Sequence, residues 1–221
     1  MIESLPAPPI HQELSKSRPV PHWWWGLKRV TDIAVALTAL IVTLPISIVA
    51  AVAIVLVSPG SPLFLQTRVG RDGRMFRMLK FRTMDAGAHL LHDDMRPLNE
   101  VDGPVLKIRN DPRLHALGAI LRRTSIDELP NFVNVLLGVM SVVGPRPPLP
   151  SEVEHYDARA LRRLTVKPGV TCLWQINGRS TVSFDRWMEL DNLYIDTWTP
   201  LDDLKIIIGT IPAVVRGNGA H

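Results

Sequence analysis

Cysteine is nearly missing from this sequence. Its 221 residues include a single one, Cys172, so an internal disulfide is excluded, and the spaced Cys and His ligands of a zinc site are lacking as well. These absences favour a reducing compartment, in which Cys172 is a small buried hydrophobic residue. Internal repeats and low-complexity tracts are also missing, and the length predicts one main domain.

A strong excess of charge is lacking too. The chain has 25 Lys and Arg against 21 Asp and Glu, which gives a net charge of +4. This modest positive charge is compatible with nucleic acid, anionic lipid or phosphorylated substrates, and it decides among none of them.

From Ile33 to Val57 the chain has no charged residue, and nearly every position is apolar. Roughly 20 apolar residues in a helix suffice to cross the hydrocarbon core of a bilayer. The run exceeds the hydrophobic region of a signal peptide, and a long Pro-rich leader precedes it. We therefore expect this segment to contact a membrane.

Pro45 lies near the middle of the apolar run, where it favours a break in the helix. Lys28 and Arg29 precede the run, and basic residues also follow it closely: Arg68, Arg71, Arg74, Arg77, Lys80 and Arg82, opposed only by Asp72. Basic flanks tend to remain cytoplasmic, so a helix that enters and leaves by one face satisfies both ends. A kinked helix that spans the bilayer is the alternative. In either topology we expect the larger downstream part to be cytoplasmic.

Three consecutive tryptophans, Trp23 to Trp25, stand just before Lys28 and Arg29. Amphipathic rings beside cations are typical of headgroup depth, so we interpret this segment as an interfacial anchor. The sequence thus divides into a disordered, Pro-rich leader over 1–21, the anchor and membrane helix over 22–57, and a cytoplasmic domain over 58–221.

The segment from Ser58 to Met84 has turn residues at both ends and the break Gly-Arg-Asp-Gly between two short apolar and basic stretches. This pattern predicts a β-hairpin. Its basic residues suit lipid headgroups, nucleic acid, a substrate phosphate or a solvated surface.

The acidic pair Asp127–Glu128 lies between two helical patterns. The first begins with Asp111 as N-cap and Pro112 at its first position, and it ends at two arginines. Ser125 and Glu128 match a capping box for the second, apolar pattern, which runs from Leu129 to Met140. Capping requires one acid, whereas a helix N-terminus that holds two also favours a phosphate or a metal-bridged phosphate. From these residues alone, capping and chemistry both remain open.

The remaining loops carry several polar side chains. Arg146 is held between prolines, which suits either a bidentate phosphate contact or a structural ion pair. Lys167, Gln175 and Arg179 lie among turn residues of the kind that line sites. From Phe184 to Val215 the pattern indicates amphipathic helices on a surface.

Several motifs in order resemble one family: "KRVTDIAVALTALIVTLP", "SPGSPLFLQTRVGRDGRMFRMLKFRTM", "NDPRLHALGAILRRTSIDELPNFVNVLLGVMSVVGPRP", "VKPGVTCLWQINGR" and "YIDTWTPLDDLKII". They resemble the bacterial sugar transferases of the monotopic polyprenyl-phosphate phosphoglycosyltransferase superfamily. The resemblance covers the chain from about Lys28 to near its C-terminus. It implies a mainly helical α+β protein, with a re-entrant, Pro-broken helix, a β-hairpin and interfacial amphipathic helices.

The resemblance also implies a reaction: transfer of a sugar-1-phosphate from a UDP-sugar to polyprenyl phosphate with release of UMP. The first acid of the pair, Asp127, corresponds to the nucleophile that carries a covalent phosphosugar, and Glu128 to the residue that assists with Mg²⁺. The corresponding substrate-binding positions here are Arg122, Pro145, Arg146, Arg179 and Lys80. Mg²⁺ and converging arginines would cancel the repulsion between a carboxylate and a diphosphate.

Two residues depart from the family pattern, Leu44 before the proline and Cys172 in "GVTCLW". The later motifs resemble the undecaprenyl-phosphate hexose-1-phosphate transferases of exopolysaccharide pathways, which suggests galactose or glucose. The implied location is the cytoplasmic face of a bacterial inner membrane, as a protein compatible with homo-oligomers. The competing hypothesis is a membrane-anchored, non-enzymatic binding or scaffold protein with a basic surface. Such a surface could bind nucleic acid, but the sequence has no recognisable nucleic-acid-binding module, so we expect no nucleic acid partner.

Overall fold

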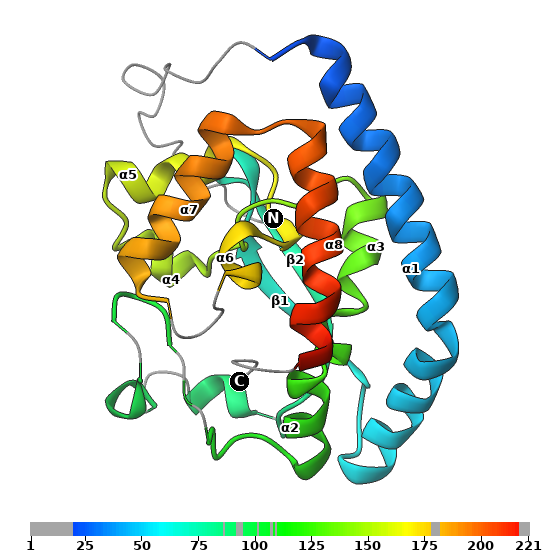
Figure 1. Cartoon of the computed structure of the whole chain (residues 1–221). Helices are drawn as coiled ribbons and strands as arrows, with labels where there is room; N and C mark the ends of the chain where they lie inside the picture. Colours follow the sequence, from blue (N-terminus) through cyan, green and yellow to red (C-terminus); the bar gives the residue numbers. More distant parts are fainter. Residues whose placement is uncertain are drawn as a thin grey trace.

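A computed structural model describes residues 20–85, 87–91, 95–100, 102–106, 108, 110–177 and 182–216 (Figure 1). The leader predicted over 1–21 lies outside them except for its last two residues. The α-helices are α1 (His22–Val57), α2 (Ala116–Arg123), α3 (Asn131–Leu136), α4 (Pro150–Val153), α5 (Ala158–Leu161), α6 (Leu173–Ile176), α7 (Phe184–Thr197) and α8 (Pro200–Arg216). The strands are β1 (Leu63–Val69), β2 (Met75–Phe81), β3 (Ser141–Val143) and β4 (Gly169–Thr171). The 3-10 helices are η1 (Arg71–Gly73), η2 (Ala88–Leu91), η3 (Arg96–Leu98), η4 (Ile126–Glu128) and η5 (Arg162–Thr165). The predicted mainly helical α+β fold is confirmed.

The predicted break at Pro45 does not interrupt the helix, because α1 is one continuous element of 36 residues that passes through Pro45. Its axis bends, so that its last turns approach α2 (Figure 1). Ala36 packs into the main core, and Ala50 and Ile54 pack beside Leu121 of α2 in a second cluster. Both halves of α1 therefore lie on the same domain. By length and composition this helix could cross a membrane.

The predicted β-hairpin is confirmed, because β1 and β2 pair antiparallel from Leu63↔Phe81 to Val69↔Met75. Its turn needs two left-handed residues, Asp72 at φ 57° and Gly73 at φ 74°, and an Asp-Gly sequence supplies them at low cost. The Asn134 side chain accepts from the Leu79 N–H at 2.9 Å and donates to a β2 carbonyl at 2.8 Å. These two bonds fix α3 against β2.

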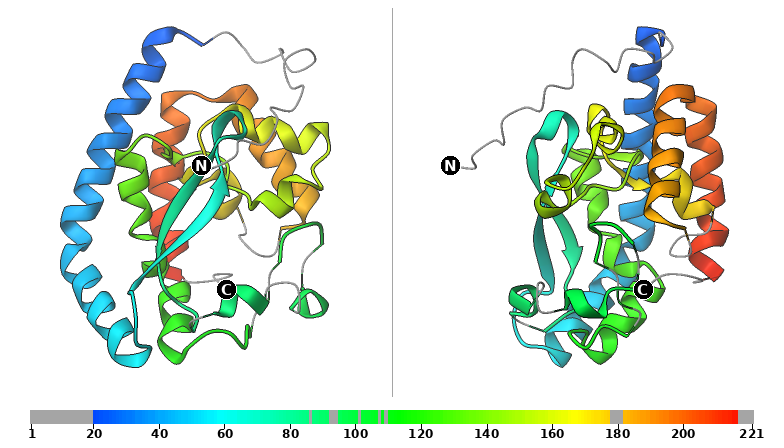
Figure 2. Two further views of the ribbon diagram at one scale, coloured as in Figure 1. Left: turned by 180° about the vertical axis from the view of Figure 1, so that it is seen from behind. Right: turned by 90° about the vertical axis from the view of Figure 1, so that its left-hand side faces the viewer.

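The main core lies between the hairpin on one side of the molecule and α7 and α8 on the other (Figure 2). The parallel pair β3 and β4 runs through this layer. The buried residues of the main core come from six elements and the segments between them: Ala36, Met78, Val135, Met140, Val142, Val143, Tyr194, Trp198 and Ile206.

Two predicted helix starts are wrong. Helix α2 begins at Ala116 with His115 as N-cap, whose Nδ1 accepts from the Gly118 N–H at 3.0 Å. Asp111 instead pairs with Arg113 at 2.6 Å, an attraction stronger than a neutral cap. The capping box is also absent at Ser125, which has φ 57° and makes no cap bond with its side chain. The apolar helix ends at Leu136, well before Met140.

Candidate active site

The acidic pair is delivered by an abrupt reversal after α2. That helix ends at Arg123, and Ser125 turns the chain through the left-handed region into η4. The Thr124 hydroxyl donates to the Ile120 carbonyl at 2.8 Å and secures the end of α2. As a result Asp127, only 8% exposed, lies at the wall of a cleft of about 660 Å³.

Glu128 forms an ion pair with Lys80 of β2, with Oε1 and Nζ 2.8 Å apart. Burial raises the pKa of Glu128. The charges of Lys80 and Arg146 and the hydrogen bond from Lys80 together lower it by more, so the pKa of Glu128 is below its usual value. Burial also lowers the pKa of Lys80, and both carboxylates oppose that effect. Glu128 is therefore the firmly ionised member of the acidic pair.

Asp127 has the opposite electrostatic environment. Burial, reinforced by repulsion from Glu128, raises its pKa to about 6, although Lys80, Arg122 and Arg146 pull it down. Within the described part of the chain its carboxylate has no hydrogen-bond or ion-pair partner. At neutral pH it is an ionised, unpaired carboxylate in a cleft, which is the state required of a nucleophile.

Three arginines surround the acids: Arg68, Arg122 and Arg146 all line the same cleft. Arg122 donates from Nε to the Thr83 hydroxyl at 3.1 Å. Arg68 donates to the Pro147 carbonyl at 2.9 Å, and its pKa falls to about 10 because of burial and repulsion from Arg146. Burial and the charge of Arg146 also lower the pKa of Arg122, and cations held this close together favour a polyanionic ligand such as a diphosphate.

The Gly-Pro-Arg mount of Arg146 is rigid because two backbones approach closely behind it. A Cβ on Gly144 would lie 2.4 Å from the Lys167 carbonyl oxygen, so only glycine fits. Pro145 is fully buried, and its carbonyl accepts from the Gly169 N–H at 2.9 Å. Pro145 therefore supports Arg146 from behind and does not line the cleft.

The lining of the cleft also includes Trp174 and Trp187, which stack with their ring centroids 4.1 Å apart and their planes at 18°. Both are buried, and their indole N–H groups lack hydrogen-bond partners among the described residues. A cleft of this volume suits a ligand the size of a nucleotide sugar.

The structure brings most of the predicted site residues together. Asp127, Glu128, Lys80, Arg122 and Arg146 share one cleft. Arg179 lies outside the described residues, and Pro45 lies in α1, away from this lining.

Sequence reasoning did not single out Arg68, Thr83 or the tryptophan pair. A strand pattern could have found Arg68, because Phe64, Gln66 and Arg68 alternate along β1 and the register places Phe64 opposite Lys80. Nothing local predicts the tryptophans, which come from α6 and α7 and meet only through tertiary packing.

Comparison with known proteins provides independent information. The family model described as bacterial sugar transferase matches residues 23–217. The galactosyl transferase CpsE of Streptococcus agalactiae serotype III (strain NEM316) is 47% identical over 162 residues, which are 73% of this chain and 36% of CpsE.

The exopolysaccharide production protein ExoY of Rhizobium meliloti (strain 1021) is 38% identical, over 88% of this chain and 88% of ExoY. The undecaprenyl-phosphate galactose phosphotransferase of Salmonella typhimurium (strain LT2) is 38% identical, over 88% of this chain and 42% of that enzyme. The chain thus spans nearly the whole of ExoY, but less than half of the other two relatives.

Proposed function

Because this chain belongs to the bacterial sugar transferase family, we propose that it moves a sugar-1-phosphate from a UDP-sugar to polyprenyl phosphate, with release of UMP. The sugar is a hexose, galactose or glucose, and the acceptor is undecaprenyl phosphate; the relatives' names include galactose, and that of a Caulobacter vibrioides relative includes glucose. The product would begin the assembly of an exopolysaccharide or a related glycoconjugate, as the name of ExoY suggests. One observation carries the proposal: a buried, unpaired Asp127 within a ring of cations.

The chemistry divides into two displacements at the phosphorus that bears the sugar. A carboxylate oxygen of Asp127 attacks this phosphorus, the bond to the bridging oxygen breaks, and UMP leaves with that oxygen. Arg68, Arg122 and Arg146 bind the phosphates and balance the charge on the leaving group. Asp127 then carries the phosphosugar as an acyl phosphate.

In the second displacement an oxygen of polyprenyl phosphate attacks the same phosphorus. The bond to Asp127 breaks, the carboxylate is regenerated, and the product is a polyprenyl diphosphate sugar. Because the intermediate is covalent, the water-soluble donor and the lipid acceptor need not bind together. A buried carboxylate with a raised pKa is also more nucleophilic than a solvated one.

The acidic pair fits Mg²⁺ by the chemistry of its donors. Mg²⁺ is usually held by one or two carboxylates together with substrate phosphates, and in the described residues no cluster of three or more His, Cys, Asp or Glu would bind it alone. Glu128, ionised beside Lys80, is the carboxylate that would hold it with the donor diphosphate. The bound ion would neutralise negative charge on the phosphates.

Both ends of α1 are tied to polar residues of the same domain, which supports a re-entrant topology. Lys28 lies 2.6 Å from Asp203 near the start, and Ser58, just after the end, bonds to Asp85 at 3.3 Å. A straight crossing by a helix of about 54 Å would separate these ends by a bilayer of about 30 Å. We place the bend of α1 near Pro45 inside the membrane and the domain on the cytoplasmic face of the inner membrane.

Exposed apolar residues also line one side of α8 at helical spacing: Leu201, Leu204, Ile208 and Ile211. Such a stripe suits the lipid headgroup region, where an active site meets a polyprenyl phosphate without extracting its tail.

The test is UMP release by the purified chain with Mg²⁺, UDP-galactose or UDP-glucose, and undecaprenyl phosphate. Asp127→Asn should lose turnover on the order of 10³-fold or more. Asp72→Asn is the matched control, since Asp72 is half-exposed in the hairpin turn and Asn tolerates its left-handed backbone. If Asp127→Asn kept its turnover, Asp127 would be rejected as the nucleophile.

A further inference from the structure

A second cavity of about 710 Å³ lies between the start of α1, the hairpin turn η1 and the corner from α7 to α8. It shares no lining residue with the cleft of Asp127. The sugar-transfer chemistry described above leaves it without a role.

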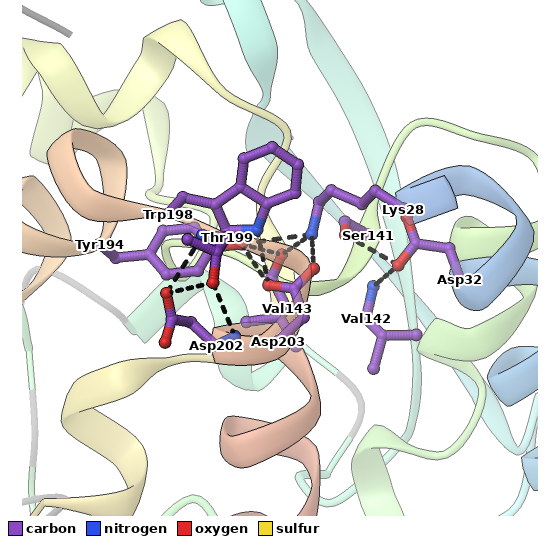
Figure 3. Close-up of polar contacts among 10 residues, drawn as sticks. All are labelled: Lys28, Asp32, Ser141, Val142, Val143, Tyr194, Trp198, Thr199, Asp202 and Asp203. Atoms are coloured by element: carbon purple, nitrogen blue, oxygen red, sulfur yellow. Dashed lines mark hydrogen bonds and ion pairs between the residues drawn. The ribbon is translucent and has the colours of Figure 1, made fainter. Parts of the chain in front are cut away.

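One wall of this cavity is a rigid polar network (Figure 3). Lys28 donates to Asp203 at 2.6 Å and to the Val143 carbonyl at 3.0 Å, while Tyr194 and Trp198 donate to Asp203 at 2.8 and 3.0 Å. The charge of Lys28 is thereby neutralised, and the Trp198 indole is fixed in position.

The other cations of the lining are not neutralised in this way. Arg29 donates to the Val135 and Leu136 carbonyls at 2.6 and 2.8 Å, which carry no net charge. Lys167 has no hydrogen-bond or ion-pair partner among the described residues. Arg71 is paired with Asp72, but both side chains are more than half exposed, so the pair adds little stability and the Arg71 guanidinium stays accessible to a ligand.

Two acids line the cavity, and only one of them is available to these cations. Asp196 is paired with Arg162, which lies outside the lining. Asp32 accepts from the Ser141 hydroxyl at 2.9 Å and from a backbone N–H, and it is the acid of the lining that is left to balance the cations. With Asp72 as the ion-pair partner of Arg71, three cations (Arg29, Arg71 and Lys167) face two acids, which leaves an excess of one positive charge. Burial, followed by the charges of Arg29 and Arg71, lowers the pKa of Lys167. A bound anion would relieve this repulsion among the three cations.

Residues of the cavity lining lie beside exposed apolar residues at the start of α1. Trp25 stacks on Trp198 with centroids 4.7 Å apart, and both line the cavity. On the same turns of α1, Trp23, Leu27 and Val30 are 67%, 42% and 65% exposed at spacings of four and three residues. Indole rings beside cations at the end of an apolar helix are typical of headgroup depth.

We propose that this cavity binds the phosphate of an anionic glycerophospholipid, with Arg71 and Lys167 contacting the phosphate and Trp25 and Trp198 packing on the glycerol region. Free phosphate shares the charge but not the apolar portion that the tryptophans would cover. The site is independent of sugar transfer and would hold the start of α1 at the membrane surface.

The experiment measures lipid bound to the full chain in detergent by native mass spectrometry, with phosphatidylglycerol, phosphatidylcholine or inorganic phosphate as the probe. The variants are Arg71→Gln, Lys167→Gln and the double substitution. Arg74→Gln is the matched control, because Arg74 is an exposed arginine beside the same turn that does not line the cavity. Circular dichroism of every variant verifies that the fold is kept.

We expect the wild type to bind phosphatidylglycerol in preference to phosphatidylcholine. Each single substitution should weaken that binding roughly tenfold, the double substitution should abolish it, and Arg74→Gln should leave it unchanged. Equal binding by the double variant, an equal loss in Arg74→Gln, or binding of inorganic phosphate without lipid would each overturn the proposal. Binding should persist in Asp127→Asn, so this outcome is separate from that of the UMP assay.

Discussion

Asp127→Asn should stabilise the protein at the same time as it removes activity. Burial holds the Asp127 pKa at about 6, against an ordinary value of 3.8. A difference of about two pH units at ~1.4 kcal/mol each corresponds to ~3 kcal/mol. Asparagine keeps the shape and one acceptor but carries no charge, so it removes this cost of burying a carboxylate.

The sign of the pH dependence follows from linkage. The folded-state pKa of Asp127 is raised, so the stability that its protonated form contributes is fully present below the unfolded pKa of about 3.9 and is lost as pH rises through about 6. Wild type and Asp127→Asn should therefore be similarly stable near pH 4. The variant should be more stable at pH 8.

Thermal unfolding in detergent, followed by intrinsic fluorescence at pH 4, 5, 6, 7 and 8, measures this difference. For a chain of this size, ~3 kcal/mol corresponds to roughly 6–12 °C in Tm at pH 8. Asp72→Asn, which removes a half-exposed acid, should leave Tm within about 2 °C of wild type at each pH. A lower Tm for Asp127→Asn at pH 8, or a gain that does not change with pH, would refute the electrostatic account of this residue.

Three further predictions concern the site, the membrane surface and the backbone. Lys80→Met removes the cation whose charge lowers the pKa of Asp127 most. That pKa should therefore rise, and the acidic limb of the kcat/KM profile for UMP release should move to higher pH; an unmoved limb would contradict this. Leu204→Glu should weaken binding to vesicles, measured by co-flotation, whereas Lys205→Glu on the exposed polar side of α8 should weaken it less; equal effects would place the stripe away from lipid. Gly144→Ala forces a Cβ to within 2.4 Å of a backbone carbonyl oxygen and should cost about 1–3 kcal/mol in the free energy of unfolding, and an unchanged Tm would disprove this close approach.

The elements that sequence reasoning predicted well are those with local signals. The uncharged run of α1 and the Asp-Gly turn of the hairpin act over a few neighbouring residues, and both elements formed where expected. The predicted N-cap at Asp111 and the predicted capping box of Ser125 and Glu128 are wrong because both acids form ion pairs instead. Asp111 has Arg113 beside it, and Glu128 has Lys80, 48 residues away in sequence.

The site could be predicted in part. The sequence placed Asp127 and Glu128 together but could not choose between capping and chemistry, since both require acids at that position. Their difference depends on burial and on Lys80, which gives one acid a partner and leaves the other without one. The register of β1 against β2 places Arg68 in the cleft, and a hydrogen bond to the Thr83 hydroxyl orients Arg122 there. A linear motif specifies neither the register nor this hydrogen bond.

The acyl phosphate on Asp127 is the central claim, and it can be tested by trapping. The full chain is incubated with Mg²⁺ and the UDP-sugar that releases UMP, without polyprenyl phosphate, then quenched in acid and digested for mass spectrometry. We expect a phosphosugar adduct on the peptide that contains Asp127, removed when polyprenyl phosphate is added before the quench. An adduct on any other residue, or turnover at full rate with no adduct formed, would contradict the account.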